Sequence, residues 1–292
     1  MAELLKGNPI AKVLYSDFRR RTDEFRKAGI ITKINIMIAS NDTAVETYSS
    51  MIIKNCEKAG IECEIRRFDY GATTEDILIE VGNANSNKSI HGLIVMLPLS
   101  KNIDERKVLA SISPVKDIDG VNPYNAGKTV LGDDSFTPNT AQACKDILVK
   151  SGIDISGKHV VIIGRSNIVG KPLANMLIQK GVDATVTVCH SRTRNLKDIC
   201  RSADIIVAAI GSPLFIKKDF TNSEQIIIDV GMNEMKNPDG SIKLVGDVDF
   251  EGVKDFVKAI TPVPGGVSPL THTALIGNIL KAVDLQLIEQ SR

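Results

Sequence analysis

Short apolar runs alternate with helix-like segments over the first hundred residues. The runs are rich in Ile, Leu and Val, and they predict strands at 33-KINIMIA-39, 61-IECEIRRF-68 and 91-HGLIVMLPL-99. Helices are expected between them, one with Tyr48 that stops at Gly60 and one over residues 75–83. Strands that alternate with helices predict a parallel sheet.

The same alternation returns after a long polar segment, 114-PVKDIDGVNPYNAGK-128, which is expected to be a functional loop. A helix over residues 140–151 leads into the buried strand Val160–Ile163. Further strands are predicted at 185-TVTVC-189, 204-DIIVAAIG-211 and 226-IIIDVG-231. The expected fold is therefore α/β, with two domains and a second parallel sheet of the Rossmann-like kind.

Composition removes several classes of partner. The chain has 292 residues, 43% of them hydrophobic, and a formal net charge of +1. Nucleic acid is not expected as a partner, and no apolar run predicts a signal peptide or a membrane span. Five cysteines without a CxxC pair favour buried thiols in a reducing cytoplasm.

The turn after the strand Val160–Ile163 is a candidate phosphate site. The sequence GRSxxVGxP begins at Gly164, and Pro172 suits the first turn of a helix that Gly181 ends. Backbone N–H groups and the helix dipole at such a turn face an anion. The pattern matches the GxGxxG fingerprint only in part, so a tight turn without a ligand is the alternative.

The next strand ends in His190-Ser191-Arg192, where an NAD site usually has an acidic residue for the ribose 2′-hydroxyl. A hydroxyl and a cation suit a 2′-phosphate instead, and Arg165 offers a second cation. NADP is therefore the expected cofactor. His190 is interpreted as a polar contact, because hydride transfer needs no histidine.

Six motifs together resemble one family over nearly the whole chain. They are KDIDG at 116–120, GRSNIVGKPLA at 164–174, TVTVCHSRT at 185–193, DVG at 229–231, GDVDF at 246–250 and TPVPGGV at 261–267. The chain resembles the bifunctional methylenetetrahydrofolate dehydrogenase/methenyltetrahydrofolate cyclohydrolase family. The resemblance implies a cytosolic homodimer of two α/β domains around a cleft, acting on tetrahydrofolate derivatives with NADP in one-carbon metabolism and purine biosynthesis.

The resemblance also assigns roles to individual residues. Asp119 is the expected anchor of the pterin ring and Tyr48 its flanking aromatic residue, although a turn aspartate and a half-buried tyrosine are the plain alternatives. Pro264, Gly265 and Gly266 are expected to bring backbone close to the substrate. The expected cofactor-binding residues are Gly164, Arg165, Ser166, Ile168, Gly170, Pro172, His190, Ser191, Arg192 and Gly211.

Two catalytic positions depart from the family pattern. The family helix has Tyr-x-x-x-Lys, with the lysine central to hydrolysis, and this chain has Ile52 there. Met96 stands where the family has a glutamine beside that lysine. Lys54 is a poor substitute, because two residues along a helix place it on another face.

Three functions follow from these observations. The favoured one is an NADP-dependent dehydrogenase with weak or absent cyclohydrolase activity. The others are a fully bifunctional enzyme with a substitute proton-transfer group, and a re-purposed paralogue that binds folate or nucleotide without turnover. The expected domains are residues 1–136 with a C-terminal helix over 270–292 for the substrate, and residues 137–269 for NADP.

Overall fold

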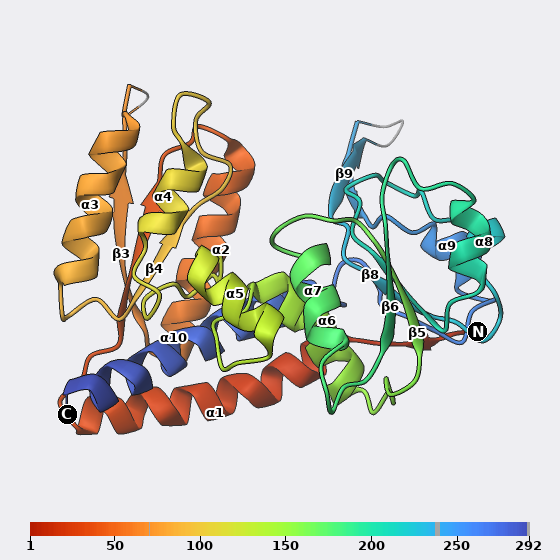
Figure 1. The fold of residues 1–292 in the computed structure, drawn as a ribbon, viewed down its shortest axis with the longest axis horizontal. Helices are drawn as coiled ribbons and strands as arrows, with labels where there is room; N and C mark the ends of the chain where they lie inside the picture. The colour runs from red at the N-terminus through yellow and green to blue at the C-terminus, as the bar shows by residue number, and fades with distance from the viewer. Residues whose placement is uncertain (70, 237–239, 291–292) are drawn as a thin grey trace. The chain divides into compact units, whose positions relative to one another are not determined.

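The computed structural model describes residues 1–69, 71–236 and 240–290, and it contains two compact units. The six-stranded unit comprises residues 1–12, 129–133 and 138–271. The three-stranded unit comprises residues 13–128, 134–137 and 272 onwards. Both sheets are parallel, which confirms the predicted α/β fold class (Figure 1).

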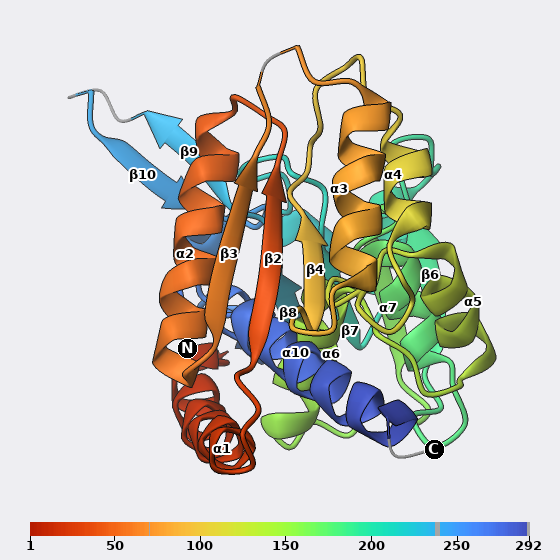
Figure 2. The same cartoon turned by 90° about the vertical axis from the view of Figure 1, so that its left-hand side faces the viewer.

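The sheet of the three-stranded unit has the order β3-β2-β4. These strands are β2 (Lys33–Ile38), β3 (Glu62–Arg67) and β4 (Gly92–Val95). Helices cover both faces of this sheet (Figures 1 and 2). They are α2 (Thr43–Ala59) and α10 (Ser268–Gln290) on one face, and α3 (Thr74–Ser86) and α4 (Glu105–Ser111) on the other.

Alternate side chains of β2 enter two different cores. Ile34, Ile36 and Ile38 pack with residues of α2 and α10. Met37 points the other way and packs with residues of α3 and α4. Successive side chains of a strand point to opposite faces, so a sheet covered on both sides requires apolar residues such as Ile36, Met37 and Ile38 in succession.

Helix α2 has the ends that its sequence predicts. The side chain of Asp42 accepts a hydrogen bond from the backbone N–H of Ala44 at 2.8 Å. Gly60 ends the helix in a left-handed conformation with φ of 79°. The prediction that this helix stops at Gly60 is confirmed.

The expected long loop over residues 114–128 is shorter than predicted, because α5 (Pro123–Leu131) begins inside it. The side-chain oxygen of Asn122 accepts a hydrogen bond from the backbone N–H of Tyr124 at 2.7 Å, which satisfies a free donor at the start of the helix. Proline suits a first helical position. Asn122 followed by Pro123 is therefore a helix start, and the prediction of a loop there is wrong.

The larger sheet has the order β1-β11-β8-β7-β5-β6. Its strands are β1 (Glu3–Leu4), β5 (His159–Ile163), β6 (Thr185–Cys189), β7 (Ile205–Ala208), β8 (Ile226–Asp229) and β11 (Ala259–Ile260). Its helical segments are α6 (Asn139–Lys150), α7 (Gly170–Leu177), α8 (Leu196–Arg201), η1 (Lys218–Phe220) and α9 (Phe250–Val253). The antiparallel hairpin β9 (Asn233–Lys236) and β10 (Ile242–Val245) completes this unit.

The units differ from the expected domains at the N-terminus. Strand β1 is the edge strand beside β11, and the N–H of Leu5 donates to the carbonyl of Ile260 at 2.9 Å. Residues 1–12 therefore belong to the six-stranded unit, whereas residues 1–136 were expected to belong together. A strand of two residues is too short to leave a pattern in the sequence.

Helix α1 (Gly7–Lys27) and helix α10 each begin in the six-stranded unit and continue in the other. From His272 onward, α10 belongs to the three-stranded unit, with Leu275, Ile276 and Ile279 in its core. No helix within the described ranges is long and apolar enough to cross a membrane.

Asn278 of α10 holds two segments of the three-stranded unit. Its side-chain amide donates to the carbonyls of Ile118 at 3.0 Å and Thr137 at 3.1 Å. We expect Asn278→Ala to lower the free energy of unfolding by about 1–3 kcal/mol, since it removes two hydrogen bonds to partly buried carbonyls. Urea denaturation measures the change. The control Asn55→Ala removes an exposed bond within α2, and an equal loss in both variants would contradict the interpretation.

Candidate functional site

The strand order of the larger sheet locates a ligand site. The chain adds β6 on one side of β5 and then continues with β7 on the other side. In open parallel sheets, ligands bind where the order reverses, outside the carboxyl ends of the strands. The residues at this position are Gly164 after β5, and Ala209 and Gly211 after β7.

Only glycine fits the two key positions of the turn after β5. Gly164 has φ of 133°, and a Cβ there would lie 2.2 Å from the carbonyl oxygen of Ala209. A Cβ on Gly170 would lie 2.0 Å from the carbonyl oxygen of Gly164. The turn thus packs backbone without side chains against the start of α7. The N-cap residue of this helix, Val169, forms no capping hydrogen bond through its side chain. The start of a helix, where the positive end of the helix dipole lies, suits a phosphate.

The other predicted cofactor residues of this turn occupy different positions. Arg165, Ser166 and Ile168 are exposed, whereas Pro172 is buried in the first turn of α7. The Ser166 hydroxyl accepts a hydrogen bond from the N–H of Val169 at 3.1 Å, so it shapes the turn. Arg165 is available to solvent or ligand.

The residues after β6 lie at the same edge of the sheet, because β6 is the neighbour of β5. Ser191 and Arg192 are exposed. Nδ1 of His190 accepts a hydrogen bond from the N–H of Arg192 at 3.2 Å. The imidazole therefore stabilises the turn that presents Ser191 and Arg192, in keeping with a polar contact.

Asp247 organises the loop after β7, a role that the sequence analysis did not predict. Its buried carboxylate accepts hydrogen bonds from the backbone N–H groups of Ile210 at 2.7 Å, Gly211 at 3.0 Å and Ser212 at 2.9 Å. Gly211 has φ of 69°. Three successive N–H groups on one carboxylate hold this loop in a single conformation.

A second buried carboxylate, Asp229 at the end of β8, supports Asp247. It accepts hydrogen bonds from the N–H groups of Asp247 at 2.9 Å, Val248 at 3.0 Å and Gly231 at 3.0 Å. A Cβ on Gly246 would lie 1.8 Å from the Asp229 carboxylate. Burial raises the pKa of Asp229 to about 7, although these three donors favour its charged form.

The TPVPGGV segment lines a small pocket of the six-stranded unit, together with residues 229–232. Gly265 has φ of 105°, and the peptide bond between Val263 and Pro264 is cis. A Cβ on Gly266 would lie 2.6 Å from the Cβ of Thr261. The predicted Pro264, Gly265 and Gly266 thus share one pocket wall with the Asp229 segment.

The three-stranded unit has a reversal of its own. The chain adds β3 on one side of β2 and β4 on the other, so a site is expected at the carboxyl ends of β2 and β4. The KDIDG segment runs beside β4, with Asp117 bridged to Leu93. A Cβ on Gly92 would lie 2.5 Å from the side chain of Ile118, so the glycine allows this close approach.

The two charged residues before Asp119 are structural. Lys116 is buried, and its ammonium donates to the carbonyls of Ala84 at 2.9 Å and Asn87 at 2.8 Å. Asp117 is fully buried and accepts a hydrogen bond from the N–H of Asn122 at 2.9 Å. Desolvation lowers the pKa of Lys116 and raises that of Asp117. Asp119 is only partly buried.

Tyr48 and Asp119 come together in this unit. Burial raises the pKa of Tyr48, and the negative charge of Asp119 raises it further. The ring of Tyr48 lies 5.8 Å from the ring of His272, with 45° between their planes. His272, on α10, was not among the predicted residues, since one histidine in an apolar helix gives no distinctive pattern.

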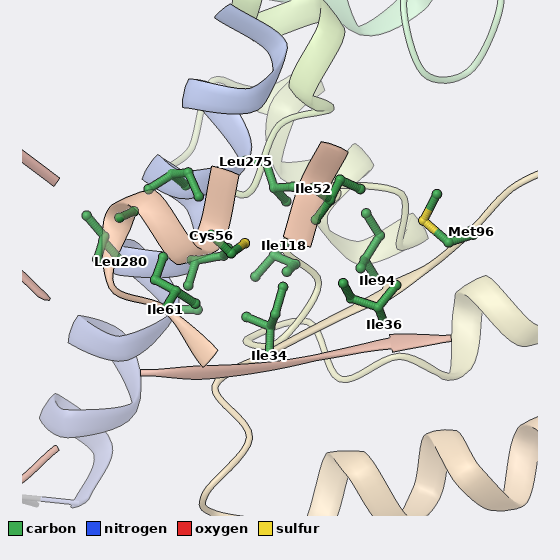
Figure 3. Close-up of a cluster of buried hydrophobic side chains, with 14 of the residues drawn as sticks. Ile34, Ile36, Ile52, Cys56, Ile61, Ile94, Met96, Ile118, Leu275 and Leu280 are labelled. Carbon is green, nitrogen blue, oxygen red and sulfur yellow. The ribbon is translucent and has the colours of Figure 1, made fainter. Parts of the chain in front are cut away.

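Ile52 and Met96 lie in the apolar core of the three-stranded unit. Their side chains are 0% and 2% exposed, and Tyr48 packs against the same cluster. Figure 3 shows Ile52 near Leu275, with Met96 in the same cluster. Lys54 is exposed on α2, so it lies on another face of the helix, as expected. Neither position 52 nor position 96 offers a polar atom able to transfer protons.

A glycine turn at the reversal of a parallel sheet defines a dinucleotide-binding α/β protein with a second α/β unit. Family models agree with this class. Residues 5–119 match the catalytic domain of tetrahydrofolate dehydrogenase/cyclohydrolase, and residues 138–287 match its NAD(P)-binding domain. The chain belongs to the tetrahydrofolate dehydrogenase/cyclohydrolase family.

Individual relatives are similar over nearly their full length. A bifunctional protein FolD of Dehalococcoides mccartyi is 44% identical over 285 residues, which is 96% of each chain. The FolD structure from Campylobacter jejuni has a TM-score of 0.93 at 35% identity, and the alignment covers 98% of this chain and 99% of that one. A Trypanosoma brucei FolD structure, complexed with NADP cofactor and inhibitor, has a TM-score of 0.92 at 32% identity and covers 98% of both chains.

The raised pKa of Asp229 predicts pH-dependent stability. Between its ordinary value of 3.8 and about 7, the folded state holds a proton that the unfolded state releases. The free energy of unfolding should therefore fall as the pH rises through this window, by up to roughly 4 kcal/mol. We expect Asp229→Asn to flatten this slope in urea denaturation, whereas the exposed Asp198→Asn keeps it. An unchanged slope in Asp229→Asn would show that another group titrates.

Proposed function

We propose that the protein is an NADP-dependent methylenetetrahydrofolate dehydrogenase, which oxidises 5,10-methylenetetrahydrofolate to 5,10-methenyltetrahydrofolate, with a weakened cyclohydrolase step. The observation that carries the proposal is the glycine turn at the switch point of the larger sheet, in a chain of this family. Its residues fit a dinucleotide, since glycines at positions 164 and 170 allow tight backbone packing in this turn and place no side chain of their own next to the helix start.

The oxidation step itself transfers no proton, so it needs no acid–base group. The reacting carbon lies between two nitrogens, whose lone pairs expel hydride and share the positive charge that remains. NADP accepts that hydride when it is bound. The protein has to hold the two reactants in register and keep water away.

In the three-stranded unit, Asp119 is the proposed anchor of the pterin, since a carboxylate accepts two parallel N–H bonds. Tyr48 covers the ring; its pKa, raised by burial and by Asp119, keeps the phenol neutral. In the six-stranded unit, Pro264, Gly265 and Gly266 offer backbone to the reactants. The positive φ of Gly265 supports this role, because it exposes backbone without a side chain.

In the proposed cofactor site, Gly164, Gly170 and Gly211 supply backbone at the switch point. The 2′-phosphate binds Ser191 and Arg165, with Arg192 as a third contact. All three side chains are exposed at one edge of the sheet. The Trypanosoma brucei relative in complex with NADP supports this choice of cofactor.

The cofactor assignment predicts a preference that two substitutions remove. Each charge-assisted bond contributes about 1.5–3 kcal/mol, so Arg165→Leu with Ser191→Ala should lower kcat/KM for NADP roughly a hundredfold or more. The value for NAD should change little. Arg106→Leu, an exposed arginine of α4, serves as the control. Equal kcat/KM for NADP and NAD in the unmodified protein would overturn the assignment.

The hydrolysis half has no polar group at positions 52 and 96. Opening the methenyl ring needs water to attack carbon while protons are removed and delivered. The burial of Ile52 and Met96 in an apolar cluster supports a loss of this function. By resemblance to the family, a lysine and a glutamine would stand there.

A fully bifunctional enzyme is the second candidate, and the names of the FolD relatives favour it. A paralogue that binds folate without turnover is the third. Incubation with methylenetetrahydrofolate and NADP separates them. Methenyl absorbance accumulates in the first case, is transient in the second and is absent in the third. By the same family resemblance, we propose a cytoplasmic homodimer.

The proposal predicts that the methenyl product accumulates, with hydrolysis slower than in an ordinary family member by roughly 10²–10⁴-fold, the usual contribution of acid–base catalysis. Ile52→Lys with Met96→Gln should restore part of the hydrolysis at some cost in stability, because both sites are buried. Asp119→Ala should abolish both activities by releasing the pterin. Hydrolysis as fast as oxidation in the unmodified protein would contradict this prediction, as measured by methenyl absorbance.

A further inference from the structure

A titratable cluster in the three-stranded unit has one member without an assigned role. His272 lies in the second turn of α10, 8% exposed, with its ring 5.8 Å from that of Tyr48. Tyr48 lies on α2, and the negative charge of Asp119, in the KDIDG segment, raises its pKa. Three elements thus bring an imidazole, a phenol and a carboxylate together.

The other side chains named for this site are unsuited to moving protons. Ile52 and Met96 are apolar and buried. The Tyr48 phenol holds its proton too tightly near neutral pH, since burial and Asp119 both raise its pKa. Asp119 is already engaged if it anchors the pterin. An imidazole accepts and returns protons close to neutral pH.

We propose that His272 is the proton-transfer group for the weakened hydrolysis of methenyltetrahydrofolate. The inference rests on the proposed function for its substrate, and it concerns a different step from hydride transfer. Tyr48 is the neighbour of both Asp119 and His272. A flat ring that Asp119 anchors and Tyr48 covers would therefore lie beside the imidazole.

Hydrolysis takes place in two stages, addition of water and opening of the ring. Water forms a C–O bond to the amidinium carbon, the π pair of the C=N bond moves to nitrogen, and His272 takes one proton from the water. The imidazolium then returns this proton to one of the two nitrogens, and the bond from carbon to that nitrogen breaks. The hydroxyl oxygen forms C=O and its proton leaves to solvent, which gives the formyl product.

The test measures hydrolysis and oxidation separately. Methenyltetrahydrofolate is supplied directly, and loss of its absorbance is compared with a protein-free blank. We expect His272→Gln and His272→Ala to lower the protein-dependent hydrolysis by at least roughly 10²-fold, a typical acid–base contribution. Oxidation of methylenetetrahydrofolate should persist, which also shows that the variants are folded. His159→Gln on β5 is the control.

Chemical rescue distinguishes proton transfer from packing. Added imidazole should restore hydrolysis in His272→Ala and leave the unmodified protein unchanged. Three results would overturn the inference: unchanged hydrolysis in both variants, no hydrolysis above the blank in the unmodified protein, or loss of oxidation together with hydrolysis. Absence of oxidation in the unmodified protein would instead refute the proposed function, while the hydrolysis assay with supplied substrate still tests His272.

Discussion

Both parallel sheets are built outward from one strand, first to one side and then to the other. The strand is β2 in the three-stranded unit and β5 in the six-stranded unit. The connections diverge at its carboxyl end, so the neighbouring loops leave room for a ligand there. The proposed cofactor-binding residues Gly164, Ser191 and Gly211 follow the ends of β5, β6 and β7 around one of these reversals.

A ligand site at the end of a strand requires that the surrounding loops hold one conformation. In the six-stranded unit, two buried carboxylates do this. Asp247 holds the loop after β7, and Asp229 holds the segment that contains Asp247. Their hydrogen bonds come from backbone N–H groups, which offset part of the cost of burying charge without a buried cation. The same arrangement makes part of the stability of this unit depend on pH.

Local signals explain what the sequence predicted well. The apolar runs of β2 and β5, the glycine stop at Gly60 and the strand–turn–helix at Gly164 are each complete within a few residues. The edge position of β1 was missed, since it depends on a partner strand far along the chain. The helix start at Pro123 was missed because its signal is confined to the Asn122-Pro123 pair. Contact between His272 and Tyr48 joins residues far apart in sequence, so no local pattern reports it.

The hydrogen bonds of Lys116 and Asp117 hold the KDIDG segment in place, and they thereby affect Asp119. The ammonium of Lys116 binds carbonyls at the C-terminal end of α3, and the carboxylate of Asp117 binds N–H groups just before α5. A cation thus meets the negative end of one helix dipole, and an anion lies close to the positive end of another. The segment is held between two oppositely charged helix ends, so Asp119 can be aligned before any ligand arrives. Charge reversal at either neighbour would misdirect Asp119, and a defect in folate binding would then arise from residues that never touch the ligand.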